Sequence, residues 1–210
     1  MQRVLHILSQ IVSCLLHPLF IPTYGMILYM LLMHNRTPEL PAIYMWLNVV
    51  GTFSLTALIP LILIILLWKR KVISSLSITD SKERTTPYVY STICFGFWSY
   101  FVYGTMHLPQ IWLFIAIGAT VTLLAVTIIN HWWKISAHLT GLGGLLGGIC
   151  SISLYYSIIP TSLIITILII SLLVMYARLY LNEHTPMQVI AGYFLGLICT
   201  FTPNFIIYHA

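Results

Sequence analysis

The distribution of charged residues constrains this chain more than any other feature. Nine of its 210 residues are Lys or Arg and four are Asp or Glu. They leave five uncharged runs, at 4–35, 40–68, 85–133, 135–177 and 184–210. Soluble domains carry about a quarter charged residues, whereas here 6% are charged and 60% are apolar. Because so few charges cannot solvate a globular surface, the sequence predicts a polytopic membrane protein.

The lengths of the uncharged runs predict the number of membrane spans. One span needs about 20 mostly apolar residues, so three runs hold one span each and the two longest hold two each. Prolines at 109 and 160 divide the long runs. The predicted helices lie near 11–33, 46–68, 88–106, 110–130, 139–157, 160–178 and 187–207. Because 88–106 is the least apolar, we expect an all-α, polytopic helical membrane bundle of six to seven transmembrane helices.

The whole chain, residues 1–210, is expected to form a single integral membrane domain. Leu58–Trp68 is continuously apolar, whereas the strands of a membrane barrel alternate apolar and polar residues. The four cysteines lie singly within apolar spans, which indicates core residues and neither a disulfide framework nor a metal site. The net charge of +5 is spread over the predicted membrane edges. We therefore expect membrane lipids as partners, with no nucleic acid and no obligate protein partner evident.

Most charges are expected to emerge at one face of the membrane. Ten of the thirteen fall at 69–84, 134 and 178–183, and pairs of predicted spans separate these positions. The opposite face has only Arg36 and Glu39. Charged groups are costly in a membrane protein and mark functional sites. The sequence therefore predicts one polar site at the face that carries the three clusters.

Lysine, arginine, serine and histidine side chains precede two predicted helices at this face. They are Lys134, Ser136 and His138 before one helix, and Arg178 and His184 before the last. Guanidinium and ammonium groups bind phosphate, and a serine hydroxyl and N-terminal amides add neutral donors. Histidine acts as a nucleophile or a general acid. Such a set suits hydrolysis of a phosphate on a lipid. Five further histidines are interpreted as interfacial residues: His6, His17, His34, His107 and His209.

The last of these segments resembles a signature of the type-2 phosphatidic acid phosphatase superfamily. Residues 177–188 read ARLYLNEHTPMQ, which is similar to the third signature, SRxxxxxHxxxD. Arg178 and His184 have the required spacing of six. ISAH at 135–138 resembles the second signature, PSGH, and KERTTP at 82–87 is a loose counterpart of the first, KxxxxxxRP. The resemblance covers roughly residues 80–196.

The resemblance implies a lipid phosphatase that needs no metal and no cofactor. His184 would attack the phosphorus and form a phosphohistidine, and His138 would protonate the leaving alkoxide. Gln188 stands at the position of the aspartate that orients the nucleophile. The substrate would be a phosphomonoester or pyrophosphate on an acyl or prenyl lipid. The groups that would hold the phosphoryl oxygens are Lys82, Arg84, Lys134, Ser136, the backbone N–H of Ala137, and Arg178.

Several departures from the family pattern leave a second function open. Gln188 carries no charge, Ala177 replaces a serine, and Ile135 and Ala137 replace proline and glycine. Ser77 stands where the first signature has its lysine. The alternative is a non-catalytic protein of the same fold that binds or transports lipid phosphate.

Two further patterns concern packing and orientation. Glycines four apart at 143/147 and 144/148, with Gly192 and Gly196, predict two helices that cross closely behind the site. Outside the presumed site, its face carries Arg3 and Lys69–Lys71, which favours the cytoplasmic side by the positive-inside rule. Many members of the family act on the outer face instead. We expect a multi-pass protein of the cell membrane, of the bacterial inner-membrane type.

Overall fold

The structure is a computed structural model that describes residues 2–33, 42–76, 78, 80–105 and 109–209. Helices joined by short links make up this part of the chain, without a strand, which confirms the predicted all-helical class. In chain order the elements are α1 (Gln2–Leu15), the 3₁₀ turn η1 (Pro18–Phe20), α2 (Ile21–Met33), α3 (Ala42–Phe53), the π-helical turn η2 (Ser54–Leu58), α4 (Ile59–Lys69), α5 (Ser81–Thr105), α6 (Gln110–Ile129), α7 (Ala137–Tyr155), α8 (Thr161–Tyr180) and α9 (Pro186–His209).

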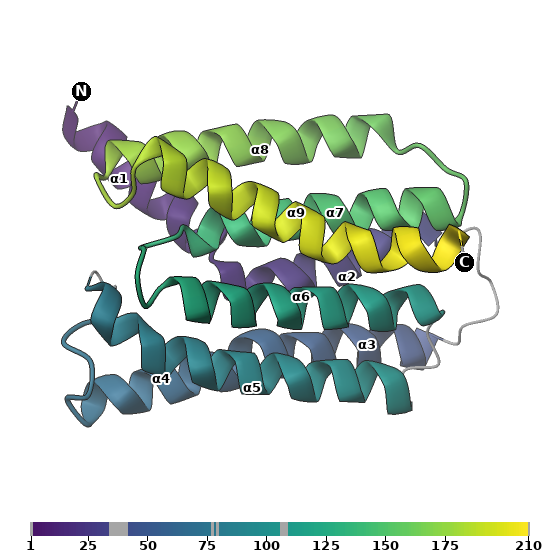
Figure 1. Cartoon of the computed structure of the whole chain (residues 1–210), viewed down its shortest axis with the longest axis horizontal. Helices are drawn as coiled ribbons and strands as arrows, with labels where there is room; N and C mark the ends of the chain where they lie inside the picture. The colour runs from purple at the N-terminus through teal and green to yellow at the C-terminus, as the bar shows by residue number, and fades with distance from the viewer. Residues whose placement is uncertain (1, 34–41, 77, 79, 106–108, 210) are drawn as a thin grey trace.

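Six segments of the described chain are long and apolar enough to cross a membrane. They are Gln2–Met33, Ile43–Lys69, Gln110–Ile129, Ala137–Tyr155, Thr161–Tyr180 and Pro186–Pro203. Helix α5 lies alongside them over the length of the bundle (Figure 1) but is not among the six. Its uncharged part, residues 88–105, contains many Tyr, Ser, Thr and Gly residues and is too polar to be counted. The expected count is therefore six without α5 and seven with it. Arg36, Glu39 and residues 107–108 lie outside the described residues.

The first span differs from the predicted continuous helix at 11–33. It begins at Gln2 and is interrupted between α1 and α2. His17 is extended there, with φ −62° and ψ 136°, because the residue before a proline disfavours the helical region. Helix α1 then packs against α8 and α2 against α7 and α3, so the two run in different directions (Figure 1). The break turns His17 towards the start of α7.

The predicted close crossing of two glycine-bearing helices is confirmed for α7 and α9. A Cβ on Gly192 would lie 2.7 Å from the carbonyl oxygen of Ser136, and one on Gly196 would meet the carbonyl of Thr140. Gly143 faces the backbone of Tyr193 in the same way. The two backbones touch because no side chain separates them. This contact holds the first turn of α7 against the first turns of α9.

Candidate active site

Four charged side chains from three chain segments meet at one end of the bundle. Oε2 of Glu183 lies 3.4 Å from Nζ of Lys134 and 3.7 Å from a terminal nitrogen of each of Arg84 and Arg178. The two arginine side chains are only 8% and 11% exposed. Nε of Arg84 also donates to the carbonyl of Ile78 at 2.7 Å, which fixes its direction. The predicted convergence of Arg84, Lys134 and Arg178 is therefore seen.

The turn between α8 and α9 places Glu183 and His184 beside Arg178. Asn182 has a left-handed φ of 53°, and its N–H donates to the carbonyl of Leu179 at 3.0 Å. The N–H of Glu183 donates to the carbonyl of Arg178 at 3.2 Å. These two bonds form a Schellman motif, in which asparagine tolerates the left-handed position. The motif reverses the chain within a few residues, so that Glu183 and His184 return to the side of Arg178.

His184 is buried and held by its Nδ1 atom. Nδ1 lies 3.1 Å from the carbonyl oxygen of Lys134 and 3.3 Å from Oε1 of Gln188. Both partners are acceptors, so the proton lies on Nδ1 and the lone pair on Nε2. Burial, with the positive charges of Arg178 and Arg84, lowers the pKa of His184 to about 4. The imidazole is therefore neutral near pH 7 and presents a nucleophilic nitrogen.

Gln188 both orients His184 and caps the last helix. Its Oε1 accepts the backbone N–H of Thr185 at 3.1 Å, while the carbonyl of Thr185 accepts the first helical bonds. Thr185 is thus the N-cap, Pro186 the first helical residue and Gln188 the third, so Gln188 makes the glutamine half of a capping box. The backbone carbonyl of Gln188 accepts the N–H of Ser136 at 3.2 Å. The capping role was missed from the sequence, although Thr-x-x-Gln is its signature.

The start of α7 contributes further donors. Ser136 is its N-cap residue, with extended φ −84° and ψ 104°, and is completely buried. Its hydroxyl and Nε of Arg178 are buried without a hydrogen-bond partner in the described part of the chain. Buried polar atoms are normally paired, and the first N–H groups of a helix, from Ala137 onward, lack helical partners. A bound oxyanion would satisfy donors of this kind.

His138 lies beside a second histidine. Its Nε2 is 3.0 Å from the carbonyl oxygen of Ser13, and its ring centroid is 5.5 Å from that of His17, edge to face. Nδ1 of His17 accepts the N–H of Leu19 at 3.4 Å. The Nε2 atom of His138 is thus engaged with α1, so the arrangement does not present it as the expected proton donor. The interpretation of His17 as an interfacial residue missed this pair; a histidine before Pro18 in an apolar run was the available signal.

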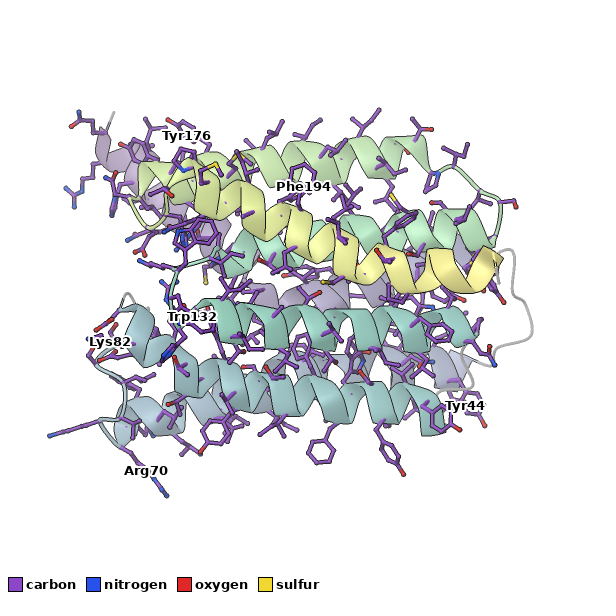
Figure 2. All side chains as sticks on the ribbon, viewed as in Figure 1. Tyr44, Arg70, Lys82, Trp132, Tyr176 and Phe194 are labelled. Atoms are coloured by element: carbon purple, nitrogen blue, oxygen red, sulfur yellow. The ribbon has the colours of Figure 1, made fainter. Side chains whose placement is uncertain are left out.

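Lys82 does not join the charged cluster, contrary to the expectation from the sequence. Its side chain is exposed, and both Lys82 and Arg70 lie at the end of the bundle (Figure 2). Its backbone N–H donates to Oδ1 of Asp80 at 2.9 Å, which caps the start of α5. Lys134 is the lysine that meets Glu183. The cationic set is therefore Arg84, Lys134 and Arg178.

A largely apolar cavity adjoins this set. About 190 Å³ of it is open to the centre of a water-sized sphere. Arg84, His17 and Ala137 line its end nearest the cluster, and Trp112 and Ile152 line its far end. A polar end and an apolar interior are suited to an amphipathic ligand.

Among the described residues, no group of three or more His, Cys, Asp or Glu side chains is placed to hold a metal ion. Comparison of the chain with known protein families, curated proteins and solved structures finds no match. The assignment of function therefore depends on the geometry of the site.

Proposed function

We propose that this chain is a membrane-bound lipid phosphate phosphatase, a divergent member of the type-2 phosphatidic acid phosphatase superfamily. The observation that carries the proposal is the state of His184: a neutral imidazole, held at Nδ1 by two acceptors, in a site where three cations converge. Such a group is an activated nucleophile in a phosphate-binding environment. The substrate is a phosphomonoester or pyrophosphate on an acyl or prenyl lipid.

In the proposed reaction, the lone pair on Nε2 of His184 attacks phosphorus and the bond from phosphorus to the leaving oxygen breaks. Arg84, Lys134 and Arg178 stabilise the charge on the phosphoryl oxygens in the transition state. The imidazole becomes positive as the N–P bond forms. Its Nδ1 proton stays hydrogen-bonded to the carbonyl of Lys134 and to Gln188, which keeps the ring aligned.

The leaving group and the second step involve the histidine pair. His138 would act here in its imidazolium form: with its Nε2 released from the carbonyl of Ser13, it would donate a proton to the leaving oxygen and become neutral. Water then attacks the phosphohistidine, the N–P bond breaks, and the water proton returns to His138 as inorganic phosphate leaves. His17, which contacts the ring of His138 edge to face, also lines the cavity.

A second candidate function is non-catalytic binding or transport of a lipid phosphate. Two observations favour it. The partner of His184 is a neutral amide, which stabilises an imidazolium less than a carboxylate does. In addition, Glu183 already occupies the centre of the three cations.

Phosphate release from a panel of lipid phosphates in detergent separates the two. The wild type is expected to release phosphate from at least one substrate, and His184→Ala is expected to release none. His131→Ala is the matched control, since His131 is an exposed histidine in the link that carries Lys134. Equal release by the His184→Ala and His131→Ala variants would refute the enzymatic proposal.

A further inference from the structure

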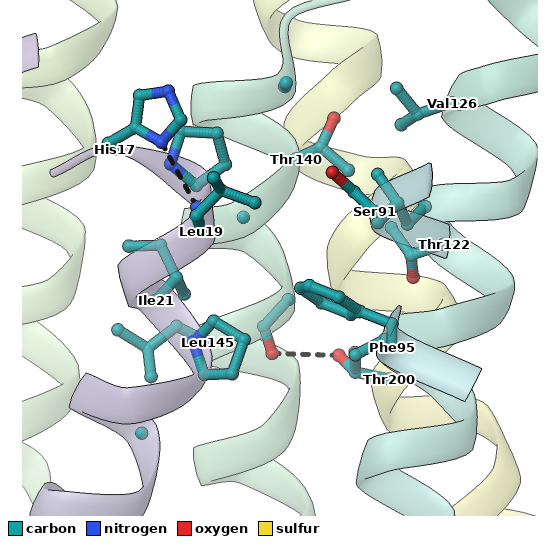
Figure 3. A pocket seen from close by; sticks show the side chains of 18 of the residues that line it. His17, Leu19, Ile21, Ser91, Phe95, Thr122, Val126, Thr140, Leu145 and Thr200 are labelled. Carbon is teal, nitrogen blue, oxygen red and sulfur yellow. Dashed lines mark hydrogen bonds between the residues drawn. The ribbon is translucent and has the colours of Figure 1, made fainter. Parts of the chain in front are cut away.

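The cavity beside the charged cluster has walls from α2, α5, α6 and α7. Figure 3 shows His17 and Ile21 on one side, with Thr122 and Val126 on the other. The hydroxyls of Thr122 and Thr140 donate to the carbonyl four residues earlier on their own helices, at 2.7 and 2.8 Å. These side chains therefore turn their hydroxyls to their own backbone. The interior is suited to hydrocarbon.

The length of the cavity can be estimated separately from two antiparallel helices that line it. Lining residues run from Ala137 to Ile152 on α7 and from Val126 to Trp112 on α6. At 1.5 Å per residue, these stretches rise about 22 Å and about 21 Å. One leaflet of a bilayer has roughly 15 Å of hydrocarbon, so the cavity accommodates a chain of lipid length. The roughly 190 Å³ open to the centre of a water-sized sphere, spread over about 22 Å, leaves room for one file of carbon atoms.

The two ends of the cavity define how a ligand would lie. Arg84 belongs both to the lining and to the charged cluster, so a phosphate at the cluster is continuous with a chain in the cavity. Leu76 also lines the cavity and is 50% exposed, which places an opening at the same end. A lipid phosphate can therefore enter with its head at the cluster and its chain inside.

We propose that this cavity binds the single hydrocarbon chain of the substrate, so that the protein acts on lipid phosphates with one chain in preference to those with two. The inference rests on the proposed function for its reaction but makes its own claim about binding. A second chain would have no place in a space one file wide.

The test changes the length of the cavity in both directions. Ala119 lines it on α6, about 10 Å from Val126 along the helix axis, so Ala119→Phe blocks it midway. Ile152→Ala, at the far end, extends it. Val121→Phe is the matched control, because Val121 lies on the same helix and is 48% exposed. Each is assayed with n-alkyl phosphates and prenyl phosphates of increasing length and with a diacyl phosphatidate.

The expected results have opposite signs. Ala119→Phe retains turnover of short chains and loses on the order of tenfold in kcat/KM for long ones, whereas Ile152→Ala moves the optimum to longer chains. Wild type prefers single-chain substrates over phosphatidate. Identical chain-length profiles for Ala119→Phe, Ile152→Ala and Val121→Phe, or equal turnover of phosphatidate, would overturn the inference.

Binding is measured separately from turnover. Native mass spectrometry of the His184→Ala protein with the same alkyl phosphates is expected to show one bound chain, and Ala119→Phe in that background loses the long ones. If no substrate releases phosphate but this binding pattern holds, the chain-binding cavity stands and the phosphatase proposal fails. Long-chain binding that Ala119→Phe leaves unchanged would contradict the cavity assignment whatever the turnover.

Discussion

At the level of single residues, one oxygen of Gln188 serves two neighbours, Nδ1 of His184 and the N–H of Thr185. A substitution that adds charge must therefore keep its length. Gln188→Glu retains both contacts and stabilises the imidazolium of the intermediate. We expect it to raise kcat by about tenfold or more, since a neutral orienting partner in the serine-protease triad costs about 10⁴-fold. Gln188→Asp is shorter by one methylene, so we expect it to gain less.

Gln188→Glu is also expected to change how kcat/KM depends on pH. The pKa of His184, lowered to about 4, keeps the ring neutral down to that pH. The acid limb of kcat/KM in the wild type therefore lies well below pH 6.5. The contribution of the neutral His184 ring to the free energy of unfolding is lost as pH falls from 6.5 towards 4, because only the unfolded state gains a proton at this position in that range. Gln188→Glu should move the acid limb upwards. A wild-type limb near pH 6.5, or an identical shift in the exposed control Gln110→Glu, would contradict this role.

Glu183 occupies the place where a phosphoryl group is proposed to bind. Removing its charge leaves Arg84, Lys134 and Arg178 free to bind an anion. We expect Glu183→Gln to strengthen inhibition by inorganic phosphate or vanadate on the order of tenfold, the worth of a charge-assisted hydrogen bond. Glu83→Gln is the control, because Glu83 accepts from Ser74 outside the cluster. Equal inhibition constants in the two variants would show that phosphate does not bind at the position of the Glu183 carboxylate.

At the level of elements, the crossing of α7 and α9 positions the site. A Cβ on Gly196 would collide with the backbone of Thr140, whereas one on Gly96 of α5 would meet nothing within 4 Å. We expect Gly196→Ala to lower the melting temperature and to abolish most activity, because the start of α7 moves away from Gln188. Gly96→Ala should leave both unchanged. Equal thermal stability of the two purified variants would show that the close crossing is dispensable.

The sequence predicts elements better than it predicts which side chains converge. Small residues four apart identified the α7–α9 crossing because backbone contact depends on residue size alone. Lys82 and Arg84 could not be separated in the same way. They are two apart on α5, and residues at this spacing do not face each other on a helix, so only one can point at Glu183. The phase of the helix, which tertiary packing sets, selects Arg84. The direction of His17 likewise depends on how α1 packs against α8.

At the level of the whole molecule, the distribution of basic residues predicts a cytoplasmic site. In a chain without its native cysteines, Ser75→Cys reports the site end, and Ser157→Cys reports the opposite end, between α7 and α8. Ser157 is exposed. We expect an impermeant thiol reagent to label Ser157→Cys in intact cells and to label Ser75→Cys only after lysis. The reverse pattern would place the site on the outer face.

The proposed mechanism requires a covalent bond between Nε2 of His184 and phosphorus. Rapid quenching of the purified protein with a radiolabelled single-chain lipid phosphate measures this most directly. We expect an acid-labile, alkali-stable label that mass spectrometry assigns to His184 and that is absent from His184→Ala. Steady phosphate release with no label on His184, or with the label on another residue, would contradict it.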